Sequence, residues 1–319
     1  MPKSIFHIVN RCLVRTICLT ICFSFIAGFT LTNEPECENK FEVKDGKNGS
    51  HILYNISSIC DTTIKRYQDL EYKSEVITVK YTQIQDDSVT FGILSPTKKN
   101  TSHFILVLGD FYGSYYDIVP LWSYFNKKGY SIIEVQYRGH SLSAMEHYPK
   151  TYGIKEVDDF LCIVKYLKET YGKNTKISVY ANSYGGLIAL NAINRTDDIY
   201  KVCFEALLFD LNLVEQKFNE GGYTMKMFLG DFSFHDYPYF SPKIQLPIVK
   251  PKLPMLFYWG ENDEAFPTDD RIIFRELVKD KNATIKIVPK VGHSFRFGYP
   301  MTQQEVDQHN MSIVKFLTE

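Results

Sequence analysis

Neither sign of charge is in excess over this chain. The 319 residues carry 36 lysines and arginines against 37 aspartates and glutamates, which gives a formal net charge of −1. The first thirty residues contain Lys3, Arg11 and Arg15 but no acid, so the rest of the chain is mildly acidic. Proteins that bind nucleic acid usually show a basic excess. The charge therefore argues against nucleic acid as a partner.

The chain also lacks the cysteine pattern of a metal site. Its 7 cysteines have no metal-ligand spacing, and we expect neither a metal nor a cofactor. The sequence shows no internal repeat, no low-complexity segment and nothing that resembles an interdomain linker. At this length one large α/β domain is the natural expectation, and the apolar content is sufficient for a single core.

The N-terminal apolar run is shorter than the roughly 20 residues of a membrane-spanning helix. It covers residues 16–29 and follows a basic start, which is typical of a cleaved signal peptide. We therefore expect residues 1–30 to be removed and the protein to be secreted or lumenal in the secretory pathway. No Ala-x-Ala cleavage site follows the run, so an uncleaved membrane anchor remains the alternative.

Six Asn-x-Ser/Thr tripeptides support passage through a glycosylating compartment. They begin at Asn48, Asn55, Asn100, Asn194, Asn282 and Asn310. We expect glycans at the first five only. Asn310 is excluded because helical spacing places it on the apolar face of the final segment, together with Val306, Ile313 and Leu317.

Four cysteines lie beyond the signal segment. In an oxidising lumen Cys37 and Cys60 are candidates for a disulfide in the N-terminal stretch. Cys162 and Cys203 lie in apolar helix and strand contexts, where we expect buried thiols.

Apolar runs alternate with amphipathic segments from about residue 75 onward. The runs predict eight strands, near residues 76–84, 89–94, 104–108, 131–136, 176–180, 204–209, 255–259 and 284–288. Helical spacing predicts helices near residues 119–128, 155–171, 184–193, 271–279 and 305–316. This alternation implies a mostly parallel sheet with helices on both faces and ligands at the carboxyl ends of the strands. Residues 31–74 are expected to be an irregular N-terminal segment.

The segment from Ile177 to Leu190 predicts a nucleophile elbow. An apolar strand ends at Ser183, and a helix begins directly after it. Ala181 and Gly185 are small, as a sharp strand-to-helix turn requires two positions on either side of its central residue. The serine then points outward at the positive N-terminus of the helix, where a backbone N–H can meet a developing oxyanion.

Two further residues complete a catalytic triad with Ser183. Asp263 and His293 each follow a later predicted strand, and Ser, Asp, His is the chain order expected when successive parallel strands supply the three residues. His293 would take the proton of Ser183 and return it to the leaving group, while Asp263 would hold the imidazole tautomer. Asp210, which follows the predicted strand at 204–209, is the alternative acid.

These motifs resemble the α/β-hydrolase superfamily, from about Glu75 to the C-terminus. The chain is most similar to the branch of monoacylglycerol lipases, lysophospholipases and serine aminopeptidases. The strand and loop at residues 104–114 match the first half of the family's oxyanion hole, and residues 137–141, Tyr-Arg-Gly-His-Ser, match its Arg-Gly-His-Gly-type turn. By this resemblance, the backbone N–H groups of Phe111 and Tyr184 form the oxyanion hole.

One further match and one departure accompany this resemblance. Residues 260–267 fit the pattern Gly-x-x-Asp-x-x-x-Pro, which favours Asp263 over Asp210 as the acid. The family's His-Gly pair is replaced by Gly109-Asp110, which places a carboxylate beside a site that binds negative charge.

The regular alternation fails at residues 212–254, where the resembled family carries a lid after the sixth strand. This stretch is rich in large apolar side chains: Phe218, Tyr223, Met225, Met227, Phe228, Phe232, Phe234, Tyr237, Tyr239 and Phe240. We expect most of them to pack the lid onto the main domain and two or three to contact an acyl chain. His235 also belongs to this stretch and is a less suitable base than His293.

The resemblance implies a serine hydrolase that cleaves carboxylic esters, of the lysophospholipase, monoacylglycerol lipase or esterase type. Its partner would be a small-molecule or lipid ester, with transient membrane contact through the lid. One alternative is a serine aminopeptidase, in which Glu264 or Asp110 would hold the substrate ammonium. A non-catalytic binding protein on the same fold is the third hypothesis.

Overall fold

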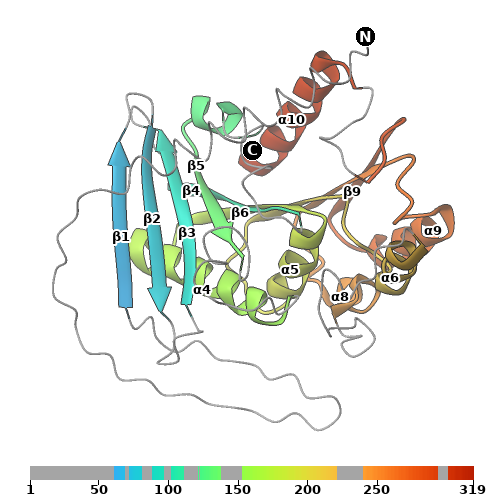
Figure 1. Cartoon of the computed structure of the whole chain (residues 1–319), viewed down its shortest axis with the longest axis horizontal. Helices are drawn as coiled ribbons and strands as arrows, with labels where there is room; N and C mark the ends of the chain where they lie inside the picture. The colour runs from blue at the N-terminus through green and yellow to red at the C-terminus, as the bar shows by residue number, and fades with distance from the viewer. Residues whose placement is uncertain are drawn as a thin grey trace, which may run out of the picture. The chain divides into compact units, whose positions relative to one another are not determined.

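The computed structural model describes residues 61–68, 72–80, 88–96, 102–110, 121, 123–137, 153–220, 240–293 and 301–319. The predicted signal segment, the candidate disulfide and the first three candidate glycan sites lie outside these residues. So does Phe111. The described part forms one sheet with helices on both faces (Figure 1). Within it, no helix is both long and apolar enough to cross a membrane.

The bounds of the elements follow the chain. The strands are β1 (Asp61–Gln68), β2 (Tyr72–Lys80), β3 (Ser88–Pro96), β4 (His103–Leu108), β5 (Ser131–Gln136), β6 (Lys176–Asn182), β7 (Lys201–Glu205), β8 (Met255–Gly260) and β9 (Ala283–Val288). The helices are α4 (Ile154–Tyr171), α5 (Tyr184–Ile193), α6 (Leu211–Glu220), α8 (Pro242–Ile248), α9 (Thr268–Val278) and α10 (Gln303–Thr318). Residues 123–127 are also helical.

The strand order across the sheet is β1-β2-β3-β5-β4-β6-β7-β8-β9. The pairings from β5 to β9 in this order are all parallel, whereas β1 pairs antiparallel with β2, β2 with β3 and β3 with β5. The predicted mostly parallel sheet is therefore confirmed. Because parallel strands end at the same edge, the loops after β4, β6, β8 and β9 meet on one side of the sheet.

Two strand predictions need correction. The described part contains nine strands rather than eight, because β1 lies within the segment 31–74 that we expected to be irregular. An edge strand is held by backbone pairing to a single neighbour, so this polar segment needs no apolar run. The strand predicted at 204–209 is β7, which ends at Glu205. It ends there because Ala206 has a φ of 52°, outside the extended region.

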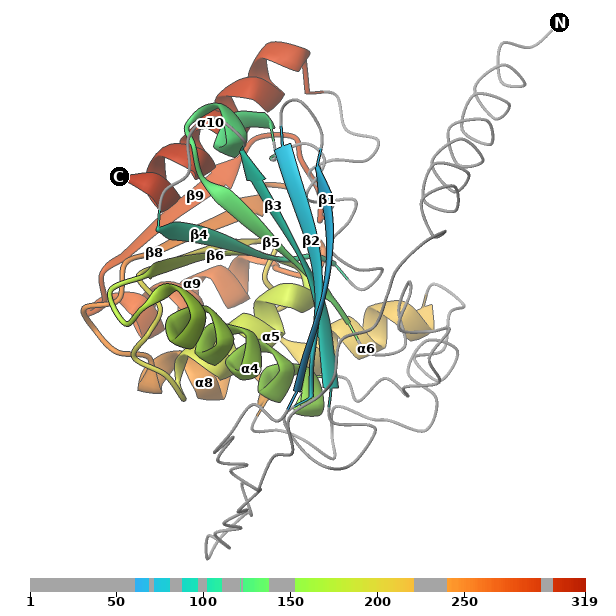
Figure 2. The same ribbon diagram turned by 90° about the vertical axis from the view of Figure 1, so that its left-hand side faces the viewer.

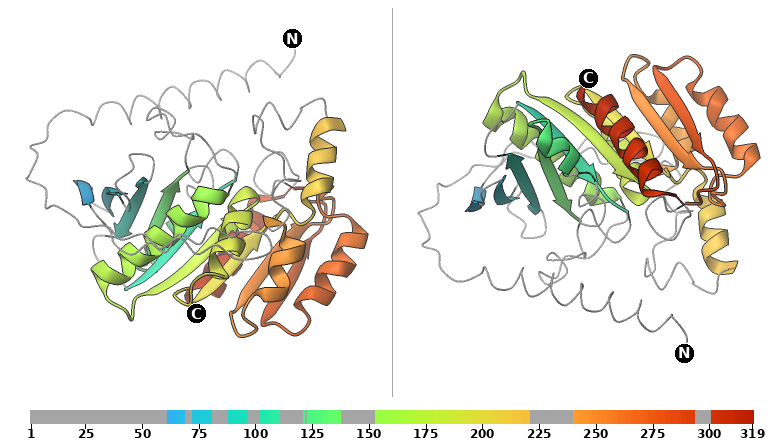
Figure 3. Two further views of the ribbon diagram at one scale, coloured as in Figure 1. Left: turned by 90° about the horizontal axis from the view of Figure 1, so that it is seen from below. Right: turned by 90° about the horizontal axis from the view of Figure 1, so that it is seen from above.

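Helices cover the two faces of the sheet unequally. α4, α5, α8 and α9 lie on one face and α10 on the other (Figure 2). Seen from above, α10 lies in front of the parallel strands, and from below α4 and α5 do (Figure 3). Two clusters of buried apolar side chains correspond to these layers, one around α4 and α5 and one beneath α10. The prediction of helices on both faces is confirmed.

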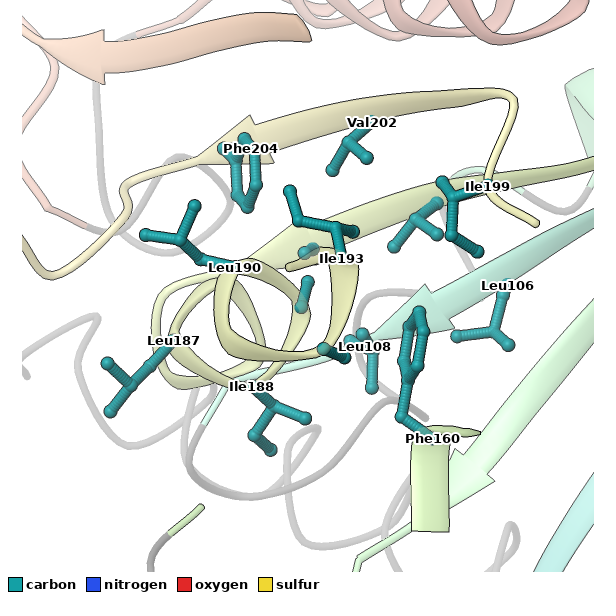
Figure 4. Close-up of a cluster of buried hydrophobic side chains, with 14 of the residues drawn as sticks. Leu106, Leu108, Phe160, Leu187, Ile188, Leu190, Ile193, Ile199, Val202 and Phe204 are labelled. Atoms are coloured by element: carbon teal, nitrogen blue, oxygen red, sulfur yellow. The ribbon is translucent and has the colours of Figure 1, made fainter. Parts of the chain in front are cut away.

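α5 is the central helix of the larger cluster, and all ten of its residues are buried. Its Leu187, Ile188, Leu190 and Ile193 lie among side chains from β4, β7 and α4 (Figure 4). Burial of each such leucine or isoleucine contributes about 1.5–3 kcal/mol. This packing fixes the position of the helix and therefore the turn that precedes it.

A hydrogen-bonded chain on the α10 side of the sheet starts at His103. The Ser178 hydroxyl donates to the carbonyl oxygen of Leu317 at 2.9 Å, so it accepts from His103 Nε2 at 2.8 Å. This arrangement needs only a neutral imidazole. Burial, together with the positive charges of Lys176 and Lys201, lowers the pKa of His103 to about 4.

The depressed pKa of His103 predicts an acid-sensitive contribution to stability. The unfolded chain, with a histidine pKa of 6.5, binds more protons than the folded protein between pH 6.5 and about 4. The contribution is therefore fully present above pH 6.5 and is lost as the pH falls through this window. His103→Gln should flatten that part of the profile when the free energy of unfolding in urea is measured against pH. If the free energy of unfolding changed with pH equally in the variant and the parent, the lowered pKa of His103 would not be the cause of the acid sensitivity.

Candidate active site

Ser183 occupies the turn between β6 and α5 in a strained backbone conformation. Its φ is 50° and its ψ is −111°, and such outliers persist only where the surrounding structure enforces them. Gly185 allows the turn, because an added Cβ would lie 2.4 Å from the carbonyl oxygen of Leu108 and 2.5 Å from that of Gly109. The Ser183 N–H donates to the carbonyl oxygen of Glu205 at 2.9 Å. The turn is therefore held against both neighbouring strands.

The structure brings the three predicted triad residues together. Ser183 Oγ lies 2.9 Å from His293 Nε2, and His293 Nδ1 lies 3.1 Å from each carboxylate oxygen of Asp263. The Asp263 residue is 3% exposed, whereas the His293 side chain is 34% exposed. An Nδ1–H that donates to the carboxylate leaves Nε2 as the acceptor for the serine hydroxyl. This tautomer can remove the serine proton.

The loops that carry the acid and the histidine are joined directly. A Cβ added to Gly260, at the end of β8, would lie 2.1 Å from the carbonyl oxygen of Val291, so only glycine fits there. The same oxygen accepts from the N–H of Asn262 at 2.8 Å. Asp263 is the next residue, and His293 lies two residues after Val291. The distance between acid and imidazole is thus fixed by backbone contacts.

The predicted oxyanion hole is described only in part. Tyr184 is the first residue of α5 and directly follows Ser183, so its N–H lies at the positive end of that helix. The other predicted donor, Phe111, follows the described end of the β4 loop. Asp110, the last described residue of that loop, is half-buried.

Asp210 has a different position from the one expected of an alternative acid. Its Oδ1 accepts from the backbone N–H groups of Asn212 at 3.0 Å and Leu213 at 3.2 Å, at the start of α6. Its Oδ2 accepts from the ammonium group of Lys243 on α8, which also pairs with Asp270 on α9 at 3.1 Å. Asp210 therefore joins α6 to α8.

The charge of Asp210 is stabilised in this position. Partial burial acts to raise its pKa, but the hydrogen bonds from Lys243 and Leu213 outweigh burial and hold the pKa below its ordinary value. The carboxylate that contacts His293 is that of Asp263.

The remaining cysteines and sequon asparagines in the described part fall in different environments. Cys162 and Cys203 are buried thiols, as expected. Asn310 is buried on α10, also as expected. Asn282 is exposed, whereas the side-chain N–H of Asn194 donates to the backbone and side-chain oxygens of Gln245.

The region predicted to be a lid is described at its two ends only. α6 and α8 lie within residues 212–254 or overlap them, and residues 221–239, with His235, fall outside the described part. Phe240 is buried in the main apolar cluster. This residue therefore packs against the domain, as we expected for most of the aromatic side chains in this stretch.

A buried polar group behind the nucleophile leaves almost no signal in the sequence. The carboxylate of Glu205, at the end of β7, is fully buried and bonds to the Tyr180 hydroxyl and to His309 Nε2. Its backbone oxygen is the acceptor for Ser183 N–H. A charged residue inside the apolar run Val-Cys-Phe-Glu-Ala-Leu is the only sequence signal. In the described part, no group of three or more His, Cys, Asp or Glu residues could hold a metal ion.

Comparisons with known proteins agree with this fold. The sequence pattern of the prolyl oligopeptidase family matches residues 121–318. No curated protein matches the chain in sequence at a significant level. Among solved structures, an acylaminoacyl peptidase in complex with Z-Gly-Gly-Phe-chloromethyl ketone is similar with a TM-score of 0.55 and 20% identity. That similarity covers 82% of this chain but only 42% of the peptidase chain.

Two esterases are similar over most of their own length. An esterase of Pyrococcus furiosus has a TM-score of 0.56 and 17% identity, over 89% of this chain and 98% of its own. The acetyl xylan esterase from Paenibacillus sp. R4 has a TM-score of 0.59 and 12% identity, over 82% of this chain and 90% of its own. At such identities the likeness shows the fold alone. The fold is that of the α/β-hydrolases, and the superfamily resemblance of the sequence is confirmed.

Proposed function

The chain belongs to the prolyl oligopeptidase family of serine hydrolases, and we propose that Ser183, His293 and Asp263 are its catalytic triad. The observation that carries this proposal is the continuous set of hydrogen bonds from Ser183 Oγ through both imidazole nitrogens of His293 to Asp263. The three residues are far apart in sequence and meet at the carboxyl edge of the sheet, at the ends of β6, β8 and β9.

The geometry supports nucleophilic catalysis in two stages. His293 Nε2 accepts the proton of Ser183 as Oγ attacks the substrate carbonyl carbon. The Tyr184 N–H, with that of Phe111 as the proposed second donor, stabilises the oxyanion. The imidazolium then gives its proton to the leaving group, which leaves an acyl-enzyme. Water, deprotonated by the same nitrogen, releases the acid and restores Ser183.

Asp263 supports both stages through its burial. The Asp263 side chain is 1% exposed, so its carboxylate interacts with the imidazolium in a medium of lower dielectric than water, which strengthens the attraction. Its two oxygens, equidistant from Nδ1, also hold the ring in the orientation that directs Nε2 to the serine.

We propose carboxylic esters as the substrates, with lysophospholipids or monoacylglycerols as the finer assignment. The esterase neighbours and the apolar composition of residues 212–254 support this choice. A peptidase is the second candidate, because the matched family is one of oligopeptidases. Exposed Glu264, beside the acid, and half-buried Asp110 are the carboxylates that would hold a substrate ammonium.

We also propose that the protein passes through the secretory pathway. The basic and apolar N-terminus supports this proposal, and so do the sequons, of which the one at Asn282 is exposed directly before β9.

The two carboxylates proposed from sequence should differ widely in their effect on the rate. Asp263→Asn should lower kcat on the order of 10⁴-fold, because the amide cannot hold the catalytic tautomer. Asp210→Asn should leave kcat within about tenfold of the parent, because this side chain caps α6 and pairs with Lys243. Steady-state kinetics with an activated aryl ester would measure both.

The free energy of unfolding, measured in urea, serves as the control for these two variants. A folded Asp210→Asn protein that lost more activity than a folded Asp263→Asn protein would contradict the assignment of the acid.

A series of substrates with different acyl groups tests which acyl group the enzyme prefers. If an acyl chain is buried on binding, kcat/KM should rise by about fourfold per methylene from acetate to octanoate, since each buried CH₂ contributes about 0.8 kcal/mol. Aryl esters of graded chain length and aminoacyl arylamides, assayed side by side, would measure this. A flat profile with faster turnover of the arylamides would reject the lipid ester and support the peptidase.

A further inference from the structure

The acid loop, residues 261–267, joins β8 to α9 and carries Asp263. Three backbone carbonyl groups, two before Asp263 and one after it, accept from the guanidinium group of Arg271 on α9. Nη2 donates to the first two and Nε to the third, at distances of 3.3 Å for Gly260, 2.7 Å for Glu261 and 2.9 Å for Phe266. One side chain therefore joins the start of the acid loop to its end.

Arg271 is suited to these contacts by its residue type and its place in the helix. It is the fourth residue of α9, and helical side chains tilt toward the N-terminus, so the guanidinium group reaches back to the loop. The helix dipole disfavours a positive charge this close to the N-terminus, and the three carbonyl oxygens offset that cost. Arginine also presents several N–H donors in one rigid plane, which a lysine does not.

The orientation of the acid depends on the backbone of the acid loop. The N–H of Ala265 donates to Oδ1 of Asp263 at 2.9 Å, and the same oxygen lies 3.1 Å from His293 Nδ1. The N–H of Phe266 donates to the carbonyl oxygen of Asp263 at 3.1 Å, which closes a turn between these residues. A shift of the backbone at the end of the loop would therefore move the carboxylate relative to the imidazole.

Other contacts hold parts of the same loop. The N–H groups of Glu261 and Asn262 donate to carbonyl oxygens of β9 and of the loop that follows it, at 2.8 Å each. The buried ring of Phe266 stacks on that of Trp259, with centroids 4.0 Å apart. Arg271 adds a direct link between the start and the end of the loop. Because the other contacts remain, its loss should loosen the loop without unfolding the domain.

We propose that Arg271 is a positioning residue, which holds the acid loop so that the carboxylate of Asp263 stays aligned with His293. This inference rests on the proposed function. Arg271 acts through Asp263, whose role lies in the chemical steps rather than in binding the substrate. Loss of the guanidinium group should therefore lower kcat and kcat/KM equally and leave KM unchanged.

The experiment compares Arg271→Gln with Arg275→Gln in the full chain. Arg275 lies one turn later on α9 and is exposed, so it is the matched control. Misplacement of a catalytic group by about 1 Å can cost about 10²-fold, so Arg271→Gln should lower kcat by about 10- to 100-fold. Arg275→Gln should keep the parental kcat, and urea unfolding should confirm that the variants are folded.

Arg271→Lys provides a second test of the same bonds. It keeps the positive charge and the long side chain but lacks the planar group that binds both ends of the loop. A folded Arg271→Lys protein should also show a lowered kcat with the parental KM, which keeps the inference testable if Arg271→Gln does not fold.

A double-mutant cycle separates positioning of the acid from a general effect on the domain. In an Asp263→Asn background the contribution of the carboxylate is already lost, so Arg271→Gln should lower kcat no further. An effect that did not pass through Asp263 would instead multiply, and the same loss would appear in both backgrounds.

Three outcomes would overturn the inference. The first is a parental kcat in a folded variant of Arg271, the second is an equal loss in the Arg271 and Arg275 variants, and the third is an undiminished effect in the Asp263→Asn background. A parental kcat in the Asp263→Asn single variant would instead reject the proposed triad, so the two failures are distinguishable.

Discussion

The site depends on the close approach of the first turn of α5 to the end of β4. No side chain fits between Gly185 and the carbonyl oxygens of Leu108 and Gly109, so the helix can begin only where the strand ends. The burial of every residue of α5 holds it there. The strain at Ser183 follows from this constraint, because the chain must reverse within one residue. The nucleophile is thus positioned by apolar packing that extends well beyond the site.

The same principle places the acid and the base. β8 and β9 are parallel neighbours, and the absence of a side chain at Gly260 lets their loops meet. Backbone contacts between these two loops then bring Asp263 and His293 within hydrogen-bond distance of each other. The polar partners Asp210, Lys243 and Asp270 join α6, α8 and α9 beside this loop.

Much of this arrangement could be predicted from the sequence, because it arises from local constraints. Small residues around a serine predict the elbow, and the bounds expected for its helix, 184–193, agree with α5. Other features depend on distant partners and leave little local signal. β1 is a polar edge strand defined by its pairing with β2, and β7 ends at a backbone conformation that an apolar run cannot reveal. The partners of Glu205 are known only once the sheet is assembled.

In the proposed mechanism Ser183 forms a covalent acyl-enzyme with the help of His293. The direct measurement is intact-protein mass spectrometry after rapid acid quenching of a reaction with a p-nitrophenyl ester, followed by peptide mapping. We predict one acyl group per chain, located on Ser183, and its absence from Ser183→Ala protein under the same conditions. Turnover of the ester by folded protein with the acyl group on another residue would contradict the account.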